Sequence, residues 1–361
     1  MDEEKKNFWN GTGKVLLILA LVIGMTSLTM NLVSRRLETT QAQAQESPEY
    51  WVPTETTDTI NILLAGQADL EGEDDFSNAI APLHDLISGY DLAAYTQKAL
   101  VNTDVMPSFA NAMSNNGFDL VGLASRHALS GGKNGVDQSL DFWMTSPMHA
   151  NGQNQSETMQ NQLKRVESSG ISIIYLSFTD VLDDPLPPGE EYLVNKYDDE
   201  KSPVMVAKAA GQADVVIVSM DWEGEDGQGP SDRQKKIADD LAYAGASVII
   251  GTADNAIQPV QWIDDTLVFY SLGTFARNAA EEDSARIAAM GGLTITKTTT
   301  ANKSHVELTN PRADFTVCDG EGGSTAIQLL ENSSLENKDD LVQQYTAVMQ
   351  SMDDSIRAGG L

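Results

Sequence analysis

Cysteine, histidine and positive charge are scarce in this sequence. The 361 residues include one cysteine, four histidines, and 23 lysines and arginines against 53 aspartates and glutamates. A single cysteine, Cys318, cannot form an intramolecular disulfide, which excludes a disulfide-stabilised framework. The formal net charge of −30 at pH 7 would repel a phosphate backbone, which excludes a general nucleic-acid binder. At 41% hydrophobic residues the chain is still long and apolar enough to bury a full core.

One long uncharged run lies near the N-terminus, from Val15 to Val33, and reads VLLILALVIGMTSLTMNLV. It is preceded by Lys14 and followed by Arg35 and Arg36, so its length and flanks predict one transmembrane helix. A cleaved signal peptide is the alternative, because Ala42-Gln43-Ala44 offers a small-residue cleavage site. A polar segment separates that site from the apolar run, so an uncleaved anchor is the prediction.

The basic residues on the two sides of this run favour a cytoplasmic N-terminus, with the rest of the chain outside the membrane. Residues 1–33 contain three basic and three acidic residues, so the outside portion has the whole net charge of −30. The predicted organisation is a cytoplasmic leader at 1–14, an anchor at 15–33, a tether at 34–58, a domain at 59–310 and a C-terminal extension with a helix at 311–361.

The composition changes near Thr59. Residues 37–58 are rich in Glu, Gln, Thr and Ser and show no apolar periodicity, which is typical of a solvated tether. Beyond Thr59, continuous apolar runs of strand length alternate with helical stretches, which predicts an α/β protein with strands covered on both faces. The predicted strands are 60–64, 120–124, 171–178, 215–220, 248–250 and 267–271, with a strand pair at 292–297 and 305–308, and the predicted helices are 78–88, 107–115, 232–244 and 338–352.

Six short motifs follow one another along the chain: GFDLVGLASRH at 117–127, LVNKYDD at 193–199, ADVVIVSMDWEGE at 213–225, AYAGASVIIG at 242–251, QPVQWI at 258–263 and YSLGTF at 270–275. In this order they resemble the CapA-type capsule-biosynthesis family, which is associated with poly-γ-glutamate synthesis. That family resembles the calcineurin-like metallophosphatases in fold. The resemblance extends over residues 59–300 and implies a metallophosphatase-like four-layer α/β/β/α sandwich, preceded here by one transmembrane helix.

The first motifs depart from the family where its polar ligands stand. Gln67 follows Gly66 in place of the family's Asp, and Thr96 and Lys98 stand in the Asn and Glu places of the next signature. A cation at Lys98 opposes metal ligation there. In the segment 124–127, Ser125 and Arg126 replace two asparagines and only His127 remains.

The later motifs have lost their imidazoles. The segment 221–225 keeps Trp222 and Glu225 of the family's His-Trp-Gly-x-Glu motif but begins with Asp221, and 252–255 replaces a histidine-rich run. Thr274 replaces the Asn of the Ser-Leu-Gly-Asn-Phe strand. A dinuclear hydrolase needs imidazoles and carboxylates that converge on two cations, and four histidines cannot supply a histidine-rich site. A retained scaffold with replaced ligands predicts a pseudoenzyme without a cofactor.

The alternative is a rewired site in which a divalent metal is held by carboxylates. Asp221 and Glu225 follow one buried strand and Asp254 follows another, and parallel strands bring such side chains to one sheet edge. Oxygen ligands suit calcium or magnesium, and His127 would position the substrate or transfer a proton. The competing interpretation is that these acids lie in loops by chance and that His127 forms a structural hydrogen bond.

Two new cations would lie at the same edge. Lys98 and Arg126 could bind a carboxylate polymer or pair with Asp221 and Glu225, and internal pairing is the favoured interpretation. Trp222 could stack on a ligand or lie at the rim of the core. The ligand-binding candidates are Gln67, Thr96, Lys98, Ser125, Arg126, Trp222, Asp254, Asn255 and Thr274.

Together these features predict a single-pass plasma-membrane protein whose extracytoplasmic domain is a catalytically degenerate accessory or scaffold in the synthesis or export of a capsule or poly-γ-glutamate-type polymer. Its expected partners are the membrane and polymer-synthesis proteins, without nucleic acid. The net charge of −30 opposes direct binding of an anionic polymer unless divalent cations or a basic patch intervene. The other hypotheses are a divalent-metal-dependent hydrolase and a surface-anchored interaction module unrelated to polymer synthesis.

Overall fold

The computed structural model describes residues 15–16, 18–35, 55–70, 76–101, 107–223, 229–252, 256–277, 286–301, 303–321 and 324–361. The chain divides into two units, residues 1–54 and residues 55–361, which are considered separately. In the first unit, Ile18–Arg35 forms a helix whose mean hydropathy of 1.5 and length are sufficient to cross a membrane. This helix overlaps the anchor expected at 15–33.

The second unit contains two β-sheets. Within its described residues, one sheet has nine strands in the order β14-β13-β12-β1-β2-β3-β4, with β11 paired to β1 and β15 paired to β13, and the other has six in the order β5-β6-β7-β8-β10-β9. The strands of the first sheet are β1 (Glu55–Asp69), β2 (Leu92–Gln97), β3 (Leu120–Gly122), β4 (His149–Asn151), β11 (Thr274–Arg277), β12 (Ile287–Thr300), β13 (Lys303–Glu321), β14 (Ser324–Leu329) and β15 (Arg357–Ala358). Those of the second are β5 (Arg165–Ser168), β6 (Ile171–Thr179), β7 (Val215–Asp221), β8 (Val248–Thr252), β9 (Val260–Ile263) and β10 (Thr266–Phe269).

Helices connect the strands. The described α-helices are α2 (His84–Ile87), α3 (Pro107–Asn115), α4 (Gly132–Trp143), α5 (Glu157–Gln160), α6 (Lys201–Ala210), α7 (Asp232–Tyr243) and α9 (Lys338–Met349), and the short 3-10 helices are η1 (Ala81–Leu83), η2 (Glu191–Leu193) and η3 (Leu330–Asn332). The helices predicted at 107–115, 232–244 and 338–352 correspond to α3, α7 and α9. The stretch 78–88 is helical only over η1 and α2, while α4 and α6 were not predicted.

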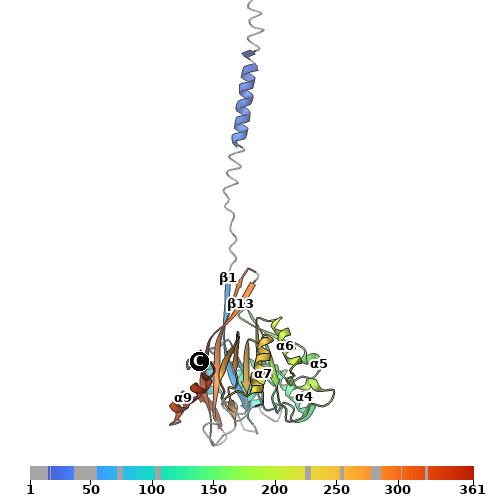
Figure 1. Ribbon diagram of the computed structural model, residues 1–361, viewed down its shortest axis with the longest axis vertical. Coiled ribbons are helices and arrows are strands. Elements are labelled where there is room, and N and C mark those ends of the chain that lie inside the picture. Colours follow the sequence, from blue (N-terminus) through green and yellow to red (C-terminus); the bar gives the residue numbers. More distant parts are fainter. Residues whose placement is uncertain are drawn as a thin grey trace, which may run out of the picture. The chain divides into compact units, whose positions relative to one another are not determined.

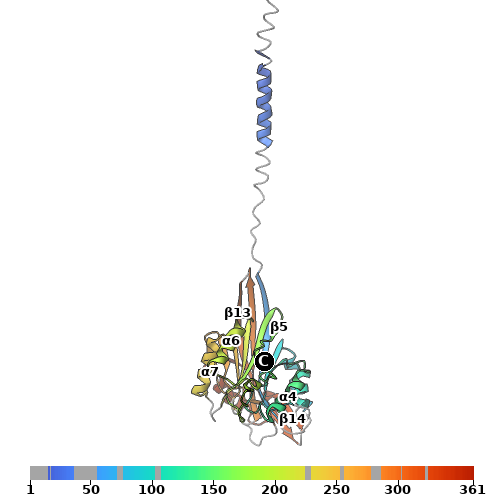
Figure 2. The same ribbon diagram turned by 90° about the vertical axis from the view of Figure 1, so that its right-hand side faces the viewer.

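Three apolar clusters define the layers. Successive side chains on a strand point to opposite faces of its sheet. Accordingly Ile62 and Ile217 lie in the cluster between the two sheets, whereas Leu63 packs with Phe109 of α3 on the outer face of the nine-stranded sheet. Val218 packs against α6 and α7 on the outer face of the other sheet. The layers therefore run α/β/β/α, as expected from the sequence (Figures 1 and 2).

Parallel pairing fixes the direction of the central strands. β6, β7 and β8 run parallel, as do β1, β2, β3 and β4. Every residue of β6, β7 and β8 is buried, which explains why their sequences are continuous apolar runs rather than alternating ones. The carboxyl ends of these strands lie at one edge of each sheet, which is where open α/β folds place their ligands.

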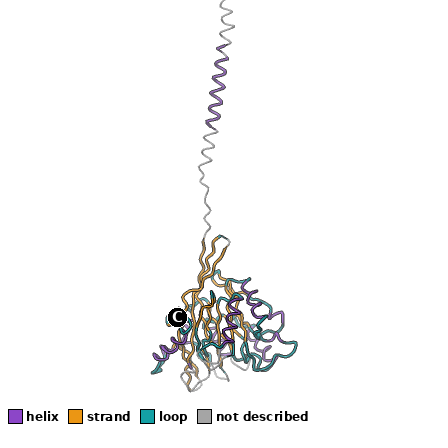
Figure 3. The backbone as a smooth tube through the Cα atoms, in the orientation of Figure 1, coloured by secondary structure: helices purple, strands orange, loops and turns teal. Residues whose placement is uncertain are grey.

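The segment after residue 276 completes the nine-stranded sheet. β12 and β13 pair antiparallel, with Lys297 opposite Val306, which confirms the predicted strand pair at 292–297 and 305–308. β13 runs through residue 310, so the segment expected as an extension supplies strands of the main sheet. At the other end, β1 begins at Glu55, before the expected start at Thr59. These long strands extend past the other strands of the unit as a narrow projection (Figure 3).

Two glycines near the carboxyl ends of their strands, Gly66 in β1 and Gly251 in β8, allow unusually close backbone approaches. A Cβ atom on Gly251 would lie 2.1 Å from the carbonyl oxygen of Tyr270 and 2.3 Å from Cζ2 of Trp222. A Cβ atom on Gly66 would lie 2.2 Å from the carbonyl oxygen of Gly273. Because backbone atoms cannot move aside cheaply, only glycine fits at these positions.

The substitution Gly251→Ala is expected to lower the free energy of unfolding by about 1–3 kcal/mol, because the added methyl group overpacks the contact between β8 and Tyr270. Gly229→Ala is the matched control, since its Cβ would meet nothing within 4 Å. The control should change stability by less than about 0.5 kcal/mol. Urea unfolding of both variants measures the difference, and equal effects would contradict this packing argument.

Candidate functional site

The candidate site lies at the carboxyl ends of the parallel strands in both sheets. β1 contributes Gln67 and Asp69, and Lys98 directly follows β2. The turn after β3 contributes Ser125, Arg126 and His127, while β6, β7 and β8 end at Thr179, Asp221 and Thr252.

Asp221 is at the centre of this edge. It is the last residue of β7 and only 5% exposed. Its Oδ2 accepts a hydrogen bond of 2.6 Å from the backbone N–H of Arg126 and one of 3.3 Å from the Thr179 hydroxyl, and its Oδ1 accepts one of 3.2 Å from Thr252 Oγ1. Burial raises the pKa of the carboxyl to about 6, although these donors and the nearby Lys98 lower it in part.

A lysine ammonium group lies beside this buried carboxyl. Lys98 is 8% exposed, and its Nζ is 3.1 Å from Oδ2 of Asp69. Its backbone is also fixed, because its N–H donates to Ala68 and its carbonyl accepts from Ser125 Oγ at 2.7 Å. Lys98 therefore forms a buried ion pair with Asp69 while its field stabilises the charged form of Asp221.

A second set of ion pairs joins the turn after β3 to the segment after β6. Asp183 accepts from His127, with Nδ1 to Oδ2 at 2.5 Å, and its Oδ1 lies 3.5 Å from Nε of Arg126. The backbone N–H of Asp183 donates to the Arg126 carbonyl at 3.0 Å. His127 and Asp183 are 36% and 48% exposed in their side chains, so this set lies at the rim of the site.

The remaining polar candidates are hydrogen-bonded within the protein. Gln67 Nε2 donates to Thr274 Oγ1 at 2.8 Å, and Thr96 Oγ1 lies 2.8 Å from Ser219 Oγ. All four side chains are at most 1% exposed. They therefore join neighbouring strands and the two sheets beneath the edge.

Trp222 lies in the core. It is 2% exposed, its Nε1 donates to the Tyr270 carbonyl at 2.9 Å, and its ring packs beside the Tyr270 ring. The indole has no face available for ligand stacking in this arrangement. The other predicted candidates at this edge, Glu225, Asp254 and Asn255, lie outside the described residues.

Sequence reasoning missed four polar residues of this site. Thr179 ends β6, Thr252 ends β8, Asp69 ends β1, and Asp183 lies in the loop that follows β6. For Asp69 the signal was weak: it lies two residues after Gln67, but β1 has register irregularities at Gln67, so alternation does not place the two side chains on one face. Lys98 and Arg126 form ion pairs with Asp69 and Asp183, neither of which was among the expected partners. Both cations also act on the charge of Asp221, while the other expected partner, Glu225, lies outside the described residues.

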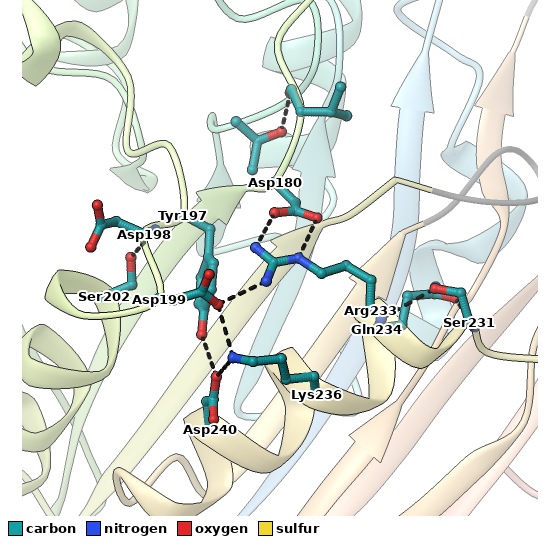
Figure 4. A network of polar contacts seen from close by, with 12 residues as sticks. Asp180, Tyr197, Asp198, Asp199, Ser202, Ser231, Arg233, Gln234, Lys236 and Asp240 are labelled. Atoms are coloured by element: carbon teal, nitrogen blue, oxygen red, sulfur yellow. Dashed lines mark hydrogen bonds and ion pairs between the residues drawn. The ribbon is translucent and has the colours of Figure 1, made fainter.

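A further polar network fixes the segment that follows β6. The backbone N–H of Asp180 donates to the Asp221 carbonyl at 2.8 Å. The Asp180 carboxylate accepts two hydrogen bonds from Arg233 of α7, at 3.2 and 2.8 Å, and Arg233 also donates to Asp199 at 2.7 Å (Figure 4). Lys236 then bridges Asp199 and Asp240. These pairs hold the 180–199 segment against α7.

The acidic side chains described at this edge are stabilised by cations or by hydrogen-bond donors of the protein itself. Asp69 and Asp183 each contact a cation, and each oxygen of Asp221 accepts at least one hydrogen bond. Within the described residues, no group of three or more His, Cys, Asp or Glu side chains is arranged to hold a metal ion. Asp221 is the one predicted metal ligand that is described, so a fit to a dinuclear centre is not supported by these residues.

The fold and this ion-paired strand edge define a four-layer α/β/β/α protein with its polar centre between the two sheets. Residues 65–279 match the family model described as bacterial capsule synthesis protein PGA_cap. The chain belongs to this family of bacterial capsule synthesis proteins, as its motifs indicated.

Two relatives resemble this chain over part of its length. The "PGA biosynthesis protein CapA" of Bacillus subtilis (strain 168) is 28% identical over 166 residues, which cover 44% of this chain and 42% of that protein. The "Capsule biosynthesis protein CapA" of Bacillus anthracis is 25% identical over 174 residues, 45% of this chain and 41% of that protein. The matched region thus spans less than half the length of these relatives.

Solved structures with a similar outline have low sequence identity. A phosphatase from Mycoplasma pneumoniae is 12% identical, with a TM-score of 0.45, over 70% of this chain and 94% of its own. A hypothetical protein from Thermus thermophilus is 14% identical, with a TM-score of 0.40, over 75% and 98% of the two chains.

The raised pKa of Asp221 predicts a pH-dependent stability. Its pKa of about 6 in the folded state lies above the ordinary value of 3.8, so the folded protein binds this proton more tightly than the unfolded chain. The stability contributed by protonation is fully present below pH 3.8 and is lost as the pH rises through about 6. Relative to Asp221→Asn, the wild-type protein should lose about 2 kcal/mol between pH 4 and pH 7.

Urea unfolding of both proteins at several pH values measures the difference in their free energies of unfolding. The test depends only on how this difference changes with pH. Asn has the same shape and does not titrate, so a constant offset between the two proteins would not matter. Parallel stability profiles from pH 4 to pH 7 would contradict the raised pKa.

Proposed function

We propose that this protein is a membrane-anchored, extracytoplasmic accessory or scaffold in the synthesis or export of a capsule or poly-γ-glutamate-type polymer, and that it acts without metal-dependent hydrolysis. The observation that carries the proposal is the Lys98 ammonium group at the strand edge where the family's resemblance implies metal ligands. The positive charge of Lys98 and the hydrogen bonds from Arg126 and Thr252 stabilise the negative charge of Asp221, which a metal ion would otherwise do.

A divalent metal at Asp221 would have to displace existing partners. The short hydrogen bond from the Arg126 N–H and the one from Thr252 occupy the carboxylate from two sides. The positive charge of Lys98 already acts on Asp221, and the same charge would repel a metal cation bound there in this largely buried site. Both effects lower metal affinity relative to an open carboxylate site.

The charge of the domain favours protein partners over direct polymer contact. The portion after residue 33 has the whole net charge of −30, which repels a polycarboxylate over most of its surface. The cations at the strand edge, Lys98 and Arg126, are paired internally. An accessory role through proteins of the polymer-synthesis machinery therefore fits this chain better than polymer binding.

The helix Ile18–Arg35 supports membrane anchoring. Its length and hydropathy are those of a spanning helix, and the lysines of the leader favour an N-terminus in the cytoplasm. We infer that the anchor is retained and that the α/β/β/α unit functions outside the membrane.

Metal titration separates the scaffold from the alternative, a divalent-metal-dependent hydrolase. A metal whose Kd is about 100 times below its working concentration would stabilise the protein by about 2.7 kcal/mol, which is a readily measured shift in Tm. We expect Mn²⁺, Zn²⁺, Ca²⁺ and Mg²⁺ to shift the Tm of wild type, Asp221→Asn and Asp339→Asn equally, the last being an exposed acid of α9 that controls for surface binding. A saturable shift that Asp221→Asn alone abolishes would establish the metal site and favour the hydrolase.

Complementation tests the biological role. In cells that lack this protein, surface polymer should fall, and expression of Asp221→Asn at wild-type levels should restore at least roughly half of it, because no step uses the carboxylate as a metal ligand. Immunoblotting against the protein verifies equal levels. Restoration by wild type but not by a folded, equally abundant Asp221→Asn protein would overturn the pseudoenzyme proposal.

A further inference from the structure

A shallow depression on the outer helical layer has an unusual combination of exposed aromatic and acidic side chains. It has a volume of about 460 Å³ and lies between α6, the end of α7 and the turn that joins β9 to β10. Tyr243, the last residue of α7, is 96% exposed, and Pro203 and Ile263 supply apolar surface beside it. A ring so exposed contributes nothing to the core of this unit.

Four acidic residues line the depression together with Tyr243: Asp199, Asp239, Asp240 and Asp264. Asp199 and Asp240 share the ammonium of Lys236, as Figure 4 shows. Within the described part of the chain, no cation is paired with Asp239 or Asp264. The depression therefore has an excess of negative charge beside an aromatic face.

The position of two of these acids is unfavourable for the free protein. Asp239 and Asp240 lie near the carboxyl end of α7, where the helix dipole favours cations, and the last turn contains no basic residue. Lys236, one turn earlier, compensates Asp240. Asp239 is thus an acid near a helix end without a described ion-pair partner, and a local arrangement that costs stability in this way is typical of a functional surface. A cation supplied from outside would compensate both the dipole and the carboxylates.

We propose that this depression is a docking surface for a basic segment of a partner protein, with a Lys or Arg side chain held over the Tyr243 ring and between Asp239 and Asp264. The charged group of that side chain would form both a cation–π contact with the ring and ion pairs with the carboxylates. The apolar walls at Pro203 and Ile263 pack against the methylene stem of such a side chain.

A peptide cation suits this surface better than an inorganic ion. The acids come from three separate segments and are interleaved with Lys236, and they do not form a metal-holding group within the described residues. An aromatic face offers nothing to a hydrated divalent ion but attracts an ammonium or guanidinium group. The negative charge of the whole domain would also steer a basic partner toward it. Docking at this surface does not depend on whether the strand edge at Asp221 binds metal.

The test uses the full chain in detergent and a fluorescent hexalysine peptide at about 0.15 M salt, with binding followed by anisotropy. We expect Tyr243→Ala and the pair Asp239→Asn/Asp264→Asn each to weaken binding by about fourfold. Tyr243→Phe should bind like wild type, because the ring and not the hydroxyl contacts the cation. The matched control, Asp339→Asn/Asp340→Asn, removes the same charge from positions on α9 and should weaken binding less than about twofold.

A second readout distinguishes docking from general attraction. Asp239→Asn should raise the Tm of the free protein, because it removes an acid from the end of a helix, while it weakens peptide binding. Equal losses of affinity in the α7 and α9 variants would show that the peptide senses only the overall charge, and would overturn the proposal. Unchanged affinity of Tyr243→Ala would overturn it as well.

Discussion

The buried carboxylate of Asp221 is the group on which the strand edge depends. It ends β7 and accepts hydrogen bonds from the turn after β3, from β6 and from β8, so one side chain connects both sheets. Burial disfavours its negative charge and raises its pKa, and the hydrogen-bond donors together with the Lys98 ammonium offset part of that cost. Without it, the Arg126 N–H and the Thr252 hydroxyl would lose their acceptor inside the protein.

Two kinds of acidic residue coexist in this chain and have different consequences. At the strand edge, Asp69 forms an ion pair with Lys98, and Asp183 contacts both Arg126 and His127. These negative charges are therefore compensated within the protein. On the outer helical layer, acids gather at the end of a helix where no described cation compensates all of them. The first arrangement stabilises the fold, and the second offers charge to a partner.

The sequence was sufficient for the layers but not for the pairs within the site. Strands such as β6 and β7 were predictable because burial on both faces demands continuous apolar runs. β2, with sequence LAAYTQ, was missed because it ends in polar residues and so does not read as an apolar run, although all of its residues are buried. The ion pairs of Lys98 and Arg126 could not be assigned, because which loops meet at an edge is decided by tertiary packing. The helix α4 was missed because Gly132 and Gly135 lower helix propensity.

We propose that family membership and mechanism separate in this protein. The apolar runs that form the α/β/β/α sandwich are present, while among the described strand-end residues Lys98 pairs with Asp69 and Arg126 pairs with Asp183. A scaffold can keep its partners and its place at the membrane without keeping its chemistry. The lysine at position 98 is the substitution that most strongly separates the two.

Anomalous diffraction from crystals of residues 55–361 soaked in millimolar Mn²⁺ tests this claim most directly, because it locates both the metal and the ammonium group. We predict no anomalous peak within bonding distance of Asp221 and a Lys98 side chain that still contacts Asp69. A manganese peak coordinated by Asp221, with Lys98 displaced from Asp69, would contradict it.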